Sequence, residues 1–106
     1  MNEMIKTRYK DALKAFRENR LEEAIAILEK AVELESGFSD GWEALGQFYL
    51  KAQRLDDAIR ATLKFSELSP DAVMAHTNLS RLYQKKGMIK EAEEELARAR
   101  LLSSKQ

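Results

Sequence analysis

Apolar and small residues recur along the chain at helical spacing. From Trp42 they occupy positions 42, 45, 46 and 49, an i, i+3, i+4, i+7 pattern that predicts a helix with one apolar face. A second stripe of the same kind runs from Leu55 to Leu68, and only residues 52–54 separate the two. Two helices joined by so short a turn pack antiparallel as a hairpin. A hairpin this small needs further copies stacked beside it to bury its stripe.

The same pattern recurs earlier and later in the chain. Residues that stand in step, about 34 positions apart, include Leu21, Leu55 and Ile89; Ala24, Ala58 and Ala92; and Leu34, Leu68 and Leu102. The pattern is carried by Trp42, Leu45, Gly46, Tyr49, Ala58, Leu68 and Pro70 in the middle repeat and by Leu79, Ser80, Tyr83, Gly87, Ala92, Leu96 and Ala99 in the third. A sustained period of about 34 residues with paired helices is typical of tetratricopeptide repeats (TPR). On these residues the chain resembles a three-repeat TPR protein.

The resemblance implies an all-α fold, a right-handed α-solenoid of three TPR helical hairpins with six helices. It covers the chain as a single TPR domain, residues 1–106, with repeats at about 5–38, 39–72 and 73–106. Hydrophobic content of 44% and charged content of 34% suit a solenoid, because each layer is thin and much of its surface stays in water. The length leaves no room for an added catalytic domain.

The chain departs from the TPR pattern at four positions. Asp11 stands where the other two repeats carry leucine, and Gln53 replaces the small turn residue, so we expect the second turn to be strained or rearranged. Phe65 occupies a site where the family usually keeps alanine, and Thr62, one turn earlier, is smaller than the usual aromatic residue. We expect Thr62 and Phe65 to exchange volume within a compensated core.

Charge and cysteine content narrow the functional classes. The net charge is zero, so no overall field draws the chain to nucleic acid or to an anionic membrane. The absence of cysteine excludes a disulfide framework and a thiolate metal site. The N-terminal stretch lacks the apolar run of a secretory signal, and no stretch is long and apolar enough to span a bilayer. These features favour a soluble, cytoplasmic protein.

No group of residues has the spacing of an active site. The single histidine, His76, stands where the preceding repeat carries Trp42, which favours a packing role over a metal ligand or general base. The four glycines form no phosphate-binding loop. Acidic runs at residues 22–23, 56–57 and 93–95 lie at the starts of second helices. There their negative charges interact favourably with the helix dipole, and water should solvate them. We therefore expect no enzyme activity, no metal and no cofactor.

In TPR folds the first helix of each pair lines a concave groove, and the resemblance implies the same arrangement here. The groove positions are then Lys6, Tyr9, Leu13, Arg17, Glu43, Gln47, Lys51, Thr77, Asn78, Arg81 and Lys85. This groove is apolar at its N-terminal end, at Tyr9 and Leu13, and cationic toward its C-terminal end, at Lys51, Arg81 and Lys85. Such a surface suits a short peptide with an apolar anchor and acidic residues. The leading hypothesis is a non-catalytic interaction module, an adaptor that binds a peptide segment of a partner protein.

One TPR sub-function can be compared position by position. Chaperone-binding TPR domains hold a terminal carboxylate with a clamp of lysines, asparagines and an arginine. The corresponding positions here are Tyr9, Leu13, Ala44, Met74 and Asn78, of which only Asn78 matches. The resemblance therefore does not extend to a chaperone carboxylate clamp.

The sequence also bears on two other functions, self-assembly and RNA binding. No further amphipathic helix follows the third repeat, so we expect Leu96, Leu101 and Leu102 to be partly uncovered. This favours, as the alternative, a self-assembling TPR scaffold, a dimer or larger homo-oligomer formed through the uncapped C-terminal helix. RNA binding through bases such as Arg81 and Lys86 is disfavoured, because the net charge is zero and the second helices are acidic.

Overall fold

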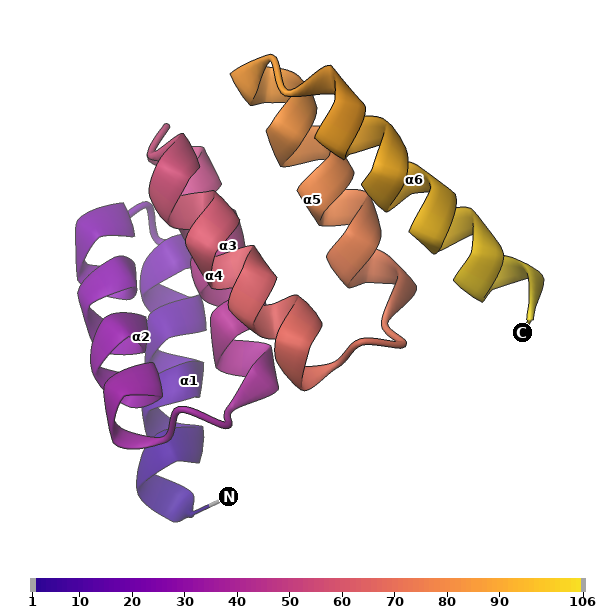
Figure 1. Cartoon of the computed structure of the whole chain (residues 1–106). Helices are drawn as coiled ribbons and strands as arrows, with labels where there is room; N and C mark the ends of the chain where they lie inside the picture. Colours follow the sequence, from indigo (N-terminus) through magenta and orange to yellow (C-terminus); the bar gives the residue numbers. More distant parts are fainter. Residues whose placement is uncertain (1, 106) are drawn as a thin grey trace.

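The computed structural model of the chain describes residues 2–105. Within this span lie the helices α1 (Glu3–Arg17), α2 (Leu21–Leu34), α3 (Ser39–Lys51), α4 (Leu55–Leu68), α5 (Val73–Lys86) and α6 (Ile89–Ser104). Consecutive helices form three antiparallel pairs that stack one beside the next (Figure 1). The predicted all-α solenoid of helical hairpins is thereby confirmed. No helix in the described part of the chain is long and apolar enough to cross a membrane.

The turn inside each pair uses one residue in the left-handed region of backbone space. The angle φ is 63° at Asn19, 62° at Gln53 and 83° at Gly87. The following residue then donates its N–H back toward the first helix, as Arg54 does to the Tyr49 carbonyl at 2.9 Å. This is the Schellman arrangement that closes a helix. The Gln53 turn is therefore not rearranged: it keeps the geometry of the Gly87 turn and holds a side chain that is strained there.

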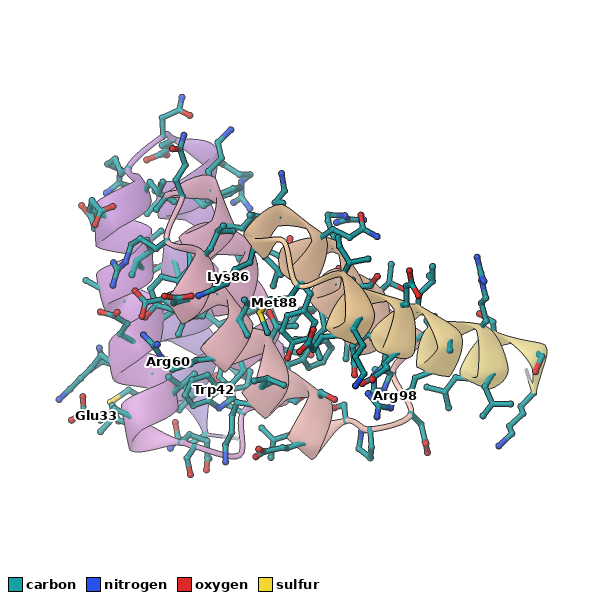
Figure 2. All side chains as sticks on the ribbon, turned by 45° about the horizontal axis from the view of Figure 1, so that its top comes forward. Glu33, Trp42, Arg60, Lys86, Met88 and Arg98 are labelled. Atoms are coloured by element: carbon teal, nitrogen blue, oxygen red, sulfur yellow. The ribbon has the colours of Figure 1, made fainter. Side chains whose placement is uncertain are left out.

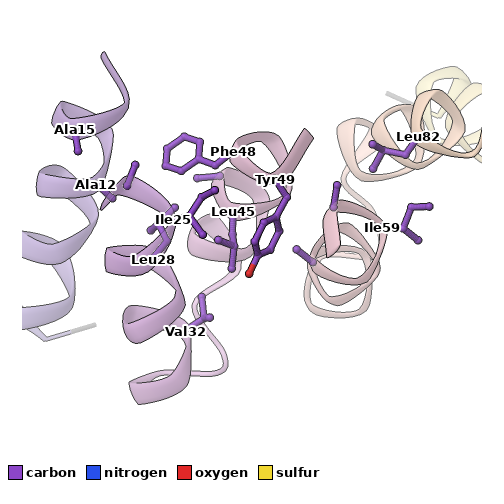
Figure 3. Packing of buried hydrophobic residues seen from close by; sticks show 14 residues of the cluster. Ala12, Ala15, Ile25, Leu28, Val32, Leu45, Phe48, Tyr49, Ile59 and Leu82 are labelled. Atoms are coloured by element: carbon purple, nitrogen blue, oxygen red, sulfur yellow. The ribbon is translucent and has the colours of Figure 1, made fainter. Parts of the chain in front are cut away.

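The main hydrophobic core joins the first two pairs and reaches α5 (Figure 3). Ala24 on α2 and Ala58 on α4 stand in step and are fully buried, so that each second helix can approach its partner closely. Phe16 of α1 stacks on Phe48 of α3, with ring centroids 4.4 Å apart and an interplanar angle of 5°. The two rings therefore help to fill the junction between the first two pairs.

Thr62 and Phe65 are both buried on α4. The Thr62 hydroxyl donates to the Ala58 carbonyl at 2.8 Å within the helix. A Cβ atom on Gly46 of α3 would lie 2.5 Å from Thr62 Oγ1, so only a glycine lets α3 approach α4 this closely. Both sites are buried, but the expected compensation is incomplete, because Thr62 lines an open hollow that Phe65 does not reach.

The outer face of α6 carries charges at two positions where a residue in step on α4 or α2 is apolar and buried. Ile59 is buried on α4, whereas Glu93, in step with it on α6, is exposed. Val32 is buried on α2, whereas Arg100, in step with it, is exposed. A polar outer face is the usual property of a terminal repeat, because that face meets water rather than another repeat.

The apolar residues expected to be uncovered at this end differ in exposure. Leu101 is 59% exposed, whereas Leu96 and Leu102 are half-buried. At the other end of the stack Asp11 is exposed on α1. All three leucines are thus at least partly uncovered, as expected, although the same face also carries the exposed charges of Glu93 and Arg100.

Candidate functional site

A hollow of about 750 Å³ opens between α3 and α5. It is lined by Phe16, Gly46, Gln47, Leu50, Lys51, Thr62, Val73, Met74, Thr77, Asn78, Arg81 and Leu82. The lining is mostly apolar, and its size lies in the range of pockets that hold small ligands. From the predicted groove positions it brings together Gln47, Lys51, Thr77, Asn78 and Arg81.

The remaining predicted groove residues lie outside this hollow. Lys6 and Arg17 are exposed on α1, and Lys85 is exposed on α5. Lys6 also forms an ion pair with Glu3, at 3.6 Å, on the open surface of the helix. Exposed pairs of this kind contribute little, so the lysine can exchange this partner for another. A role for these residues in binding stays a prediction.

Tyr9 and Leu13, the predicted apolar anchor, are half-buried and pack against the core. The Tyr9 ring meets Phe38 edge-on, with centroids 5.3 Å apart. Burial, and then the negative charges of Asp40 and Glu43, raise the pKa of Tyr9; burial and then Asp40 raise the pKa of the Glu43 carboxyl. Tyr9 and Leu13 are therefore less accessible than expected, and acids stand beside Tyr9.

Two bases line the hollow, Lys51 from α3 and Arg81 from α5. Among residues 2–105 neither makes an ion pair, so both charges are available to a ligand. Lys86, by contrast, pairs with Asp56 near the start of α4, and its side chain extends toward that helix (Figure 2). This pair takes up one of the bases on which RNA binding would depend.

The apolar wall of the hollow includes Leu50, Met74 and Leu82, which were not among the predicted groove positions. Met74 is 51% exposed, so it contributes a flexible apolar side chain that a ligand can reach. A signal for this wall existed in the sequence at Thr62, because both other repeats carry leucine in step with it. A side chain smaller than its repeat equivalents predicts open space beside it.

A buried polar cluster ties α5 to α6. His76 Nδ1 lies 2.8 Å from Glu95 Oε1, and Nε2 lies 3.0 Å from the Pro70 carbonyl, to which it donates. The second Glu95 oxygen accepts from the Arg98 guanidinium. The packing role predicted for His76 is confirmed, since the residue is buried. Among the described residues no group of three or more His, Asp or Glu side chains could hold a metal ion.

The expectation of solvated acids at residues 93–95 is wrong for Glu95. Glu93 and Glu94 are exposed, but Glu95 is buried, because its place on α6 faces α5. The sequence held a signal here too: Glu95 stands in step with Ile27 and Ala61, which are both apolar. A carboxylate at an inward position needs a buried partner, and His76 supplies it.

Comparisons with known sequences point to one family. Two family models, both described as tetratricopeptide repeat, match residues 15–64 and 75–104, which together make up more than half of the chain. A comparison with curated protein sequences gives no match.

Solved structures share the architecture over nearly the whole chain. A crystal structure of MamA has a TM-score of 0.92 and 25% identity, covering 95% of this chain and 59% of its own. The type III secretion chaperone SycD of Yersinia enterocolitica, in complex with a peptide of the translocator YopD, has a TM-score of 0.90 and 19% identity, covering 96% and 78%. The second TPR of Spaghetti (RPAP3), bound to the HSP90 peptide SRMEEVD, has a TM-score of 0.87 and 17% identity, covering 94% and 93%. The chain thus spans less than two thirds of the MamA chain.

Proposed function

Because the chain is a member of the tetratricopeptide-repeat family, we propose that it is a non-catalytic adaptor that binds a peptide segment of a partner protein in the groove formed by its first helices. The observation that carries the proposal is the open hollow between α3 and α5, with apolar walls and with Lys51 and Arg81 among its lining residues. Exposed charge pairs contribute about 0.2–1 kcal/mol each, so affinity has to come from several contacts together and is modest.

Two solved structures with this fold support a peptide as the ligand. SycD was solved with a YopD peptide and RPAP3 with an HSP90 peptide. The ligand of the present chain differs from the HSP90 peptide, because only Asn78 matches the carboxylate-clamp positions. Its groove instead favours a segment with acidic residues for Lys51, Arg81 and Lys85 and with an apolar anchor.

Self-assembly through α6 is the alternative, and it is supported by the exposure of Leu101. The charged residues Glu93 and Arg100 on the outer face of α6 count against it, because stacking would remove both from water. Peptide binding is therefore the preferred function. The cytoplasmic location expected from the sequence stays a prediction.

The test is affinity capture from cell lysate with a charge-reversed groove variant. We expect Lys51→Glu, Arg81→Glu, Lys85→Glu to lose partners that the unaltered chain retains. The matched control reverses three bases on the second helices, Lys30→Glu, Lys64→Glu, Lys90→Glu, and should keep those partners. Both triple variants change the net charge equally, so a difference between them reports the location of the site.

Three results would contradict groove binding. A partner retained by the groove variant and lost by the control would move the site to the second helices. A partner retained by both variants would move it to the ends of the stack. Capture of further copies of the chain alone, together with a dimer in light scattering, would favour self-assembly.

A further inference from the structure

The hollow exists because the two junctions between helical pairs are filled differently. The first junction lies between the α1–α2 pair and the α3–α4 pair. Leu28 of α2 is fully buried there, and Phe16 of α1 stacks on Phe48 of α3. These three large side chains pack into the contact between the first two pairs, and Phe16 also borders the hollow. The first junction therefore shows what a filled contact between successive pairs looks like in this fold.

At the second junction the counterpart of each of these three side chains is smaller. Thr62 stands in step with Leu28, Leu50 with Phe16, and Leu82 with Phe48. All three smaller residues line the hollow, together with Gly46, which has no side chain at all. Phe65, the large residue of the volume exchange, is buried but does not line the hollow. The exchange therefore preserves the core of α4 and leaves space beside Thr62, on the side of α3 and α5.

The lining indicates the chemistry of an occupant. Leu50, Leu82 and the half-exposed Met74 form an apolar wall that favours a large aliphatic or aromatic side chain. Lys51 and Arg81 add positive charge from opposite helices, and none of the residues 2–105 that line the hollow is acidic. An apolar side chain with a carboxylate next to it in sequence matches both features.

Resting on the proposed function above, we propose that this hollow receives one large apolar side chain of the partner segment, of the size of leucine, methionine or phenylalanine. An acidic residue adjacent to that side chain in the segment pairs with Lys51 or Arg81. Thr62 sets the depth of the pocket, because a leucine there, as in both other repeats, would occupy the space. The inference deepens the proposed function by assigning the apolar anchor to the second junction rather than to Tyr9 and Leu13.

The probe is a set of fluorescein-labelled peptides, Gly-Ser-Glu-X-Asp-Ser-Gly, in which X is Leu, Met, Phe or Ser. Binding to the intact chain is measured by fluorescence anisotropy. We expect the Leu, Met and Phe peptides to bind about ten-fold or more tightly than the Ser peptide, since burial of a large apolar side chain favours binding to that extent. Amide chemical-shift changes should centre on the residues that line the hollow.

Two variants test the pocket itself. Thr62→Leu should reduce the preference for large X to less than about three-fold, because the new side chain fills the space. Thr7→Leu, the same replacement at an exposed site on α1, is the matched control and should leave the preference unchanged. Met74→Asp alters a half-exposed residue at the hollow, so it is expected to fold even if Thr62→Leu does not. It should weaken binding of every peptide by repelling their carboxylates.

The outcomes separate this inference from the proposed function. The pocket proposal is overturned if the residue at X has no effect on binding or if no peptide binds. Groove binding itself still stands in either case if the charge-reversed groove variant loses the lysate partner. If Thr62→Leu folds and keeps the preference, the anchor lies elsewhere and the proposal is again overturned. If the unaltered chain dimerises and Thr62→Leu abolishes the dimer, the occupant is a second copy and the partner peptide is excluded. The proposal is supported if Thr62→Leu loses the preference for a large residue at X and Thr7→Leu keeps it.

Discussion

Gly46 on α3 lies so close to Thr62 on α4 that a Cβ atom on the glycine would stand 2.5 Å from Thr62 Oγ1. The other two repeats carry Ala12 and Ser80 in step with Gly46, each with a leucine in step with Thr62. The Thr62 hydroxyl is held toward its own helix by its bond to the Ala58 carbonyl, which fixes it beside the glycine. The effect of changing Gly46 therefore depends on which residue stands at position 62.

Replacing Gly46 with alanine should destabilise the fold by up to about 2 kcal/mol. Overpacking strain of about 1–3 kcal/mol outweighs the gain of roughly 1 kcal/mol in helix propensity. In a Thr62→Ala background the same change should be neutral or stabilising, because the clashing oxygen is gone. Urea unfolding of the four proteins in this double-mutant cycle gives the coupling energy, and a coupling near zero would contradict the close contact.

The fold could be predicted from the sequence because its signals are local and repeated. Apolar stripes fix each helix, and the turn positions in step with Gly87 fix each hairpin. Even Gln53, a poor residue for that turn, adopts the same backbone geometry, since the flanking helices determine it.

The site was harder to predict, because it depends on which large side chains are missing between helices. The sequence shows that Thr62 is small, but whether Phe65 refills the space depends on the direction in which the ring packs. The burial of Glu95 was hard to predict for a related reason: the residue belongs to an acidic run whose other members are exposed. In both cases comparison with the residues in step was more informative than the local sequence.

Breaking the buried contact between His76 and Glu95 should be strongly destabilising. His76→Trp alone would leave the Glu95 carboxylate buried with only the exposed Arg98 as partner, at an expected loss of roughly 2–4 kcal/mol in the free energy of unfolding. The double change His76→Trp, Glu95→Ala introduces the residues of the middle repeat, Trp42 and Ala61, and should recover most of that loss.

The measurement is chemical unfolding of His76→Trp, of Glu95→Ala and of the double variant. Lys30→Ala, which removes an exposed pair with Glu33, serves as control and should change stability by less than about 1 kcal/mol. If the double variant were no more stable than His76→Trp alone, the loss would come from the histidine's packing and not from the stranded carboxylate.

Stability should fall in the alkaline range because of Tyr49. Burial, and then the hydrogen bond that its hydroxyl donates to Glu29, raise the pKa of Tyr49 above its ordinary value of 10.0. The unfolded chain therefore releases this proton at lower pH than the folded chain. The contribution to stability is complete below about pH 10 and is lost as the pH rises from there toward the folded pKa.

The comparison that isolates this effect is the pH dependence of unfolding in the unaltered chain and in Tyr49→Phe. Between about pH 9 and pH 11 the unaltered chain should lose stability more steeply, since the variant has one linked proton fewer. Contributions from the groups that the two proteins share cancel in the difference. Equal slopes would show that the Tyr49 hydroxyl titrates alike in the folded and unfolded states.

The charged outer face of α6 should prevent end-to-end stacking. Glu93→Ile, Arg100→Val places on α6 the residue types that are buried at Ile59 and Val32, and so enlarges an apolar patch that already includes Leu101. We expect this double variant to associate as concentration rises, because the new patch favours stacking against another chain, whereas the unaltered chain stays monomeric over the same range in light scattering.

The control variant, Lys90→Val, Glu94→Ile, lies on an exposed part of the same helix. It adds equal apolar area off the stacking face and should associate less. Association of the unaltered chain to the same extent would show that Glu93 and Arg100 do not protect this end, and it would favour the self-assembling scaffold.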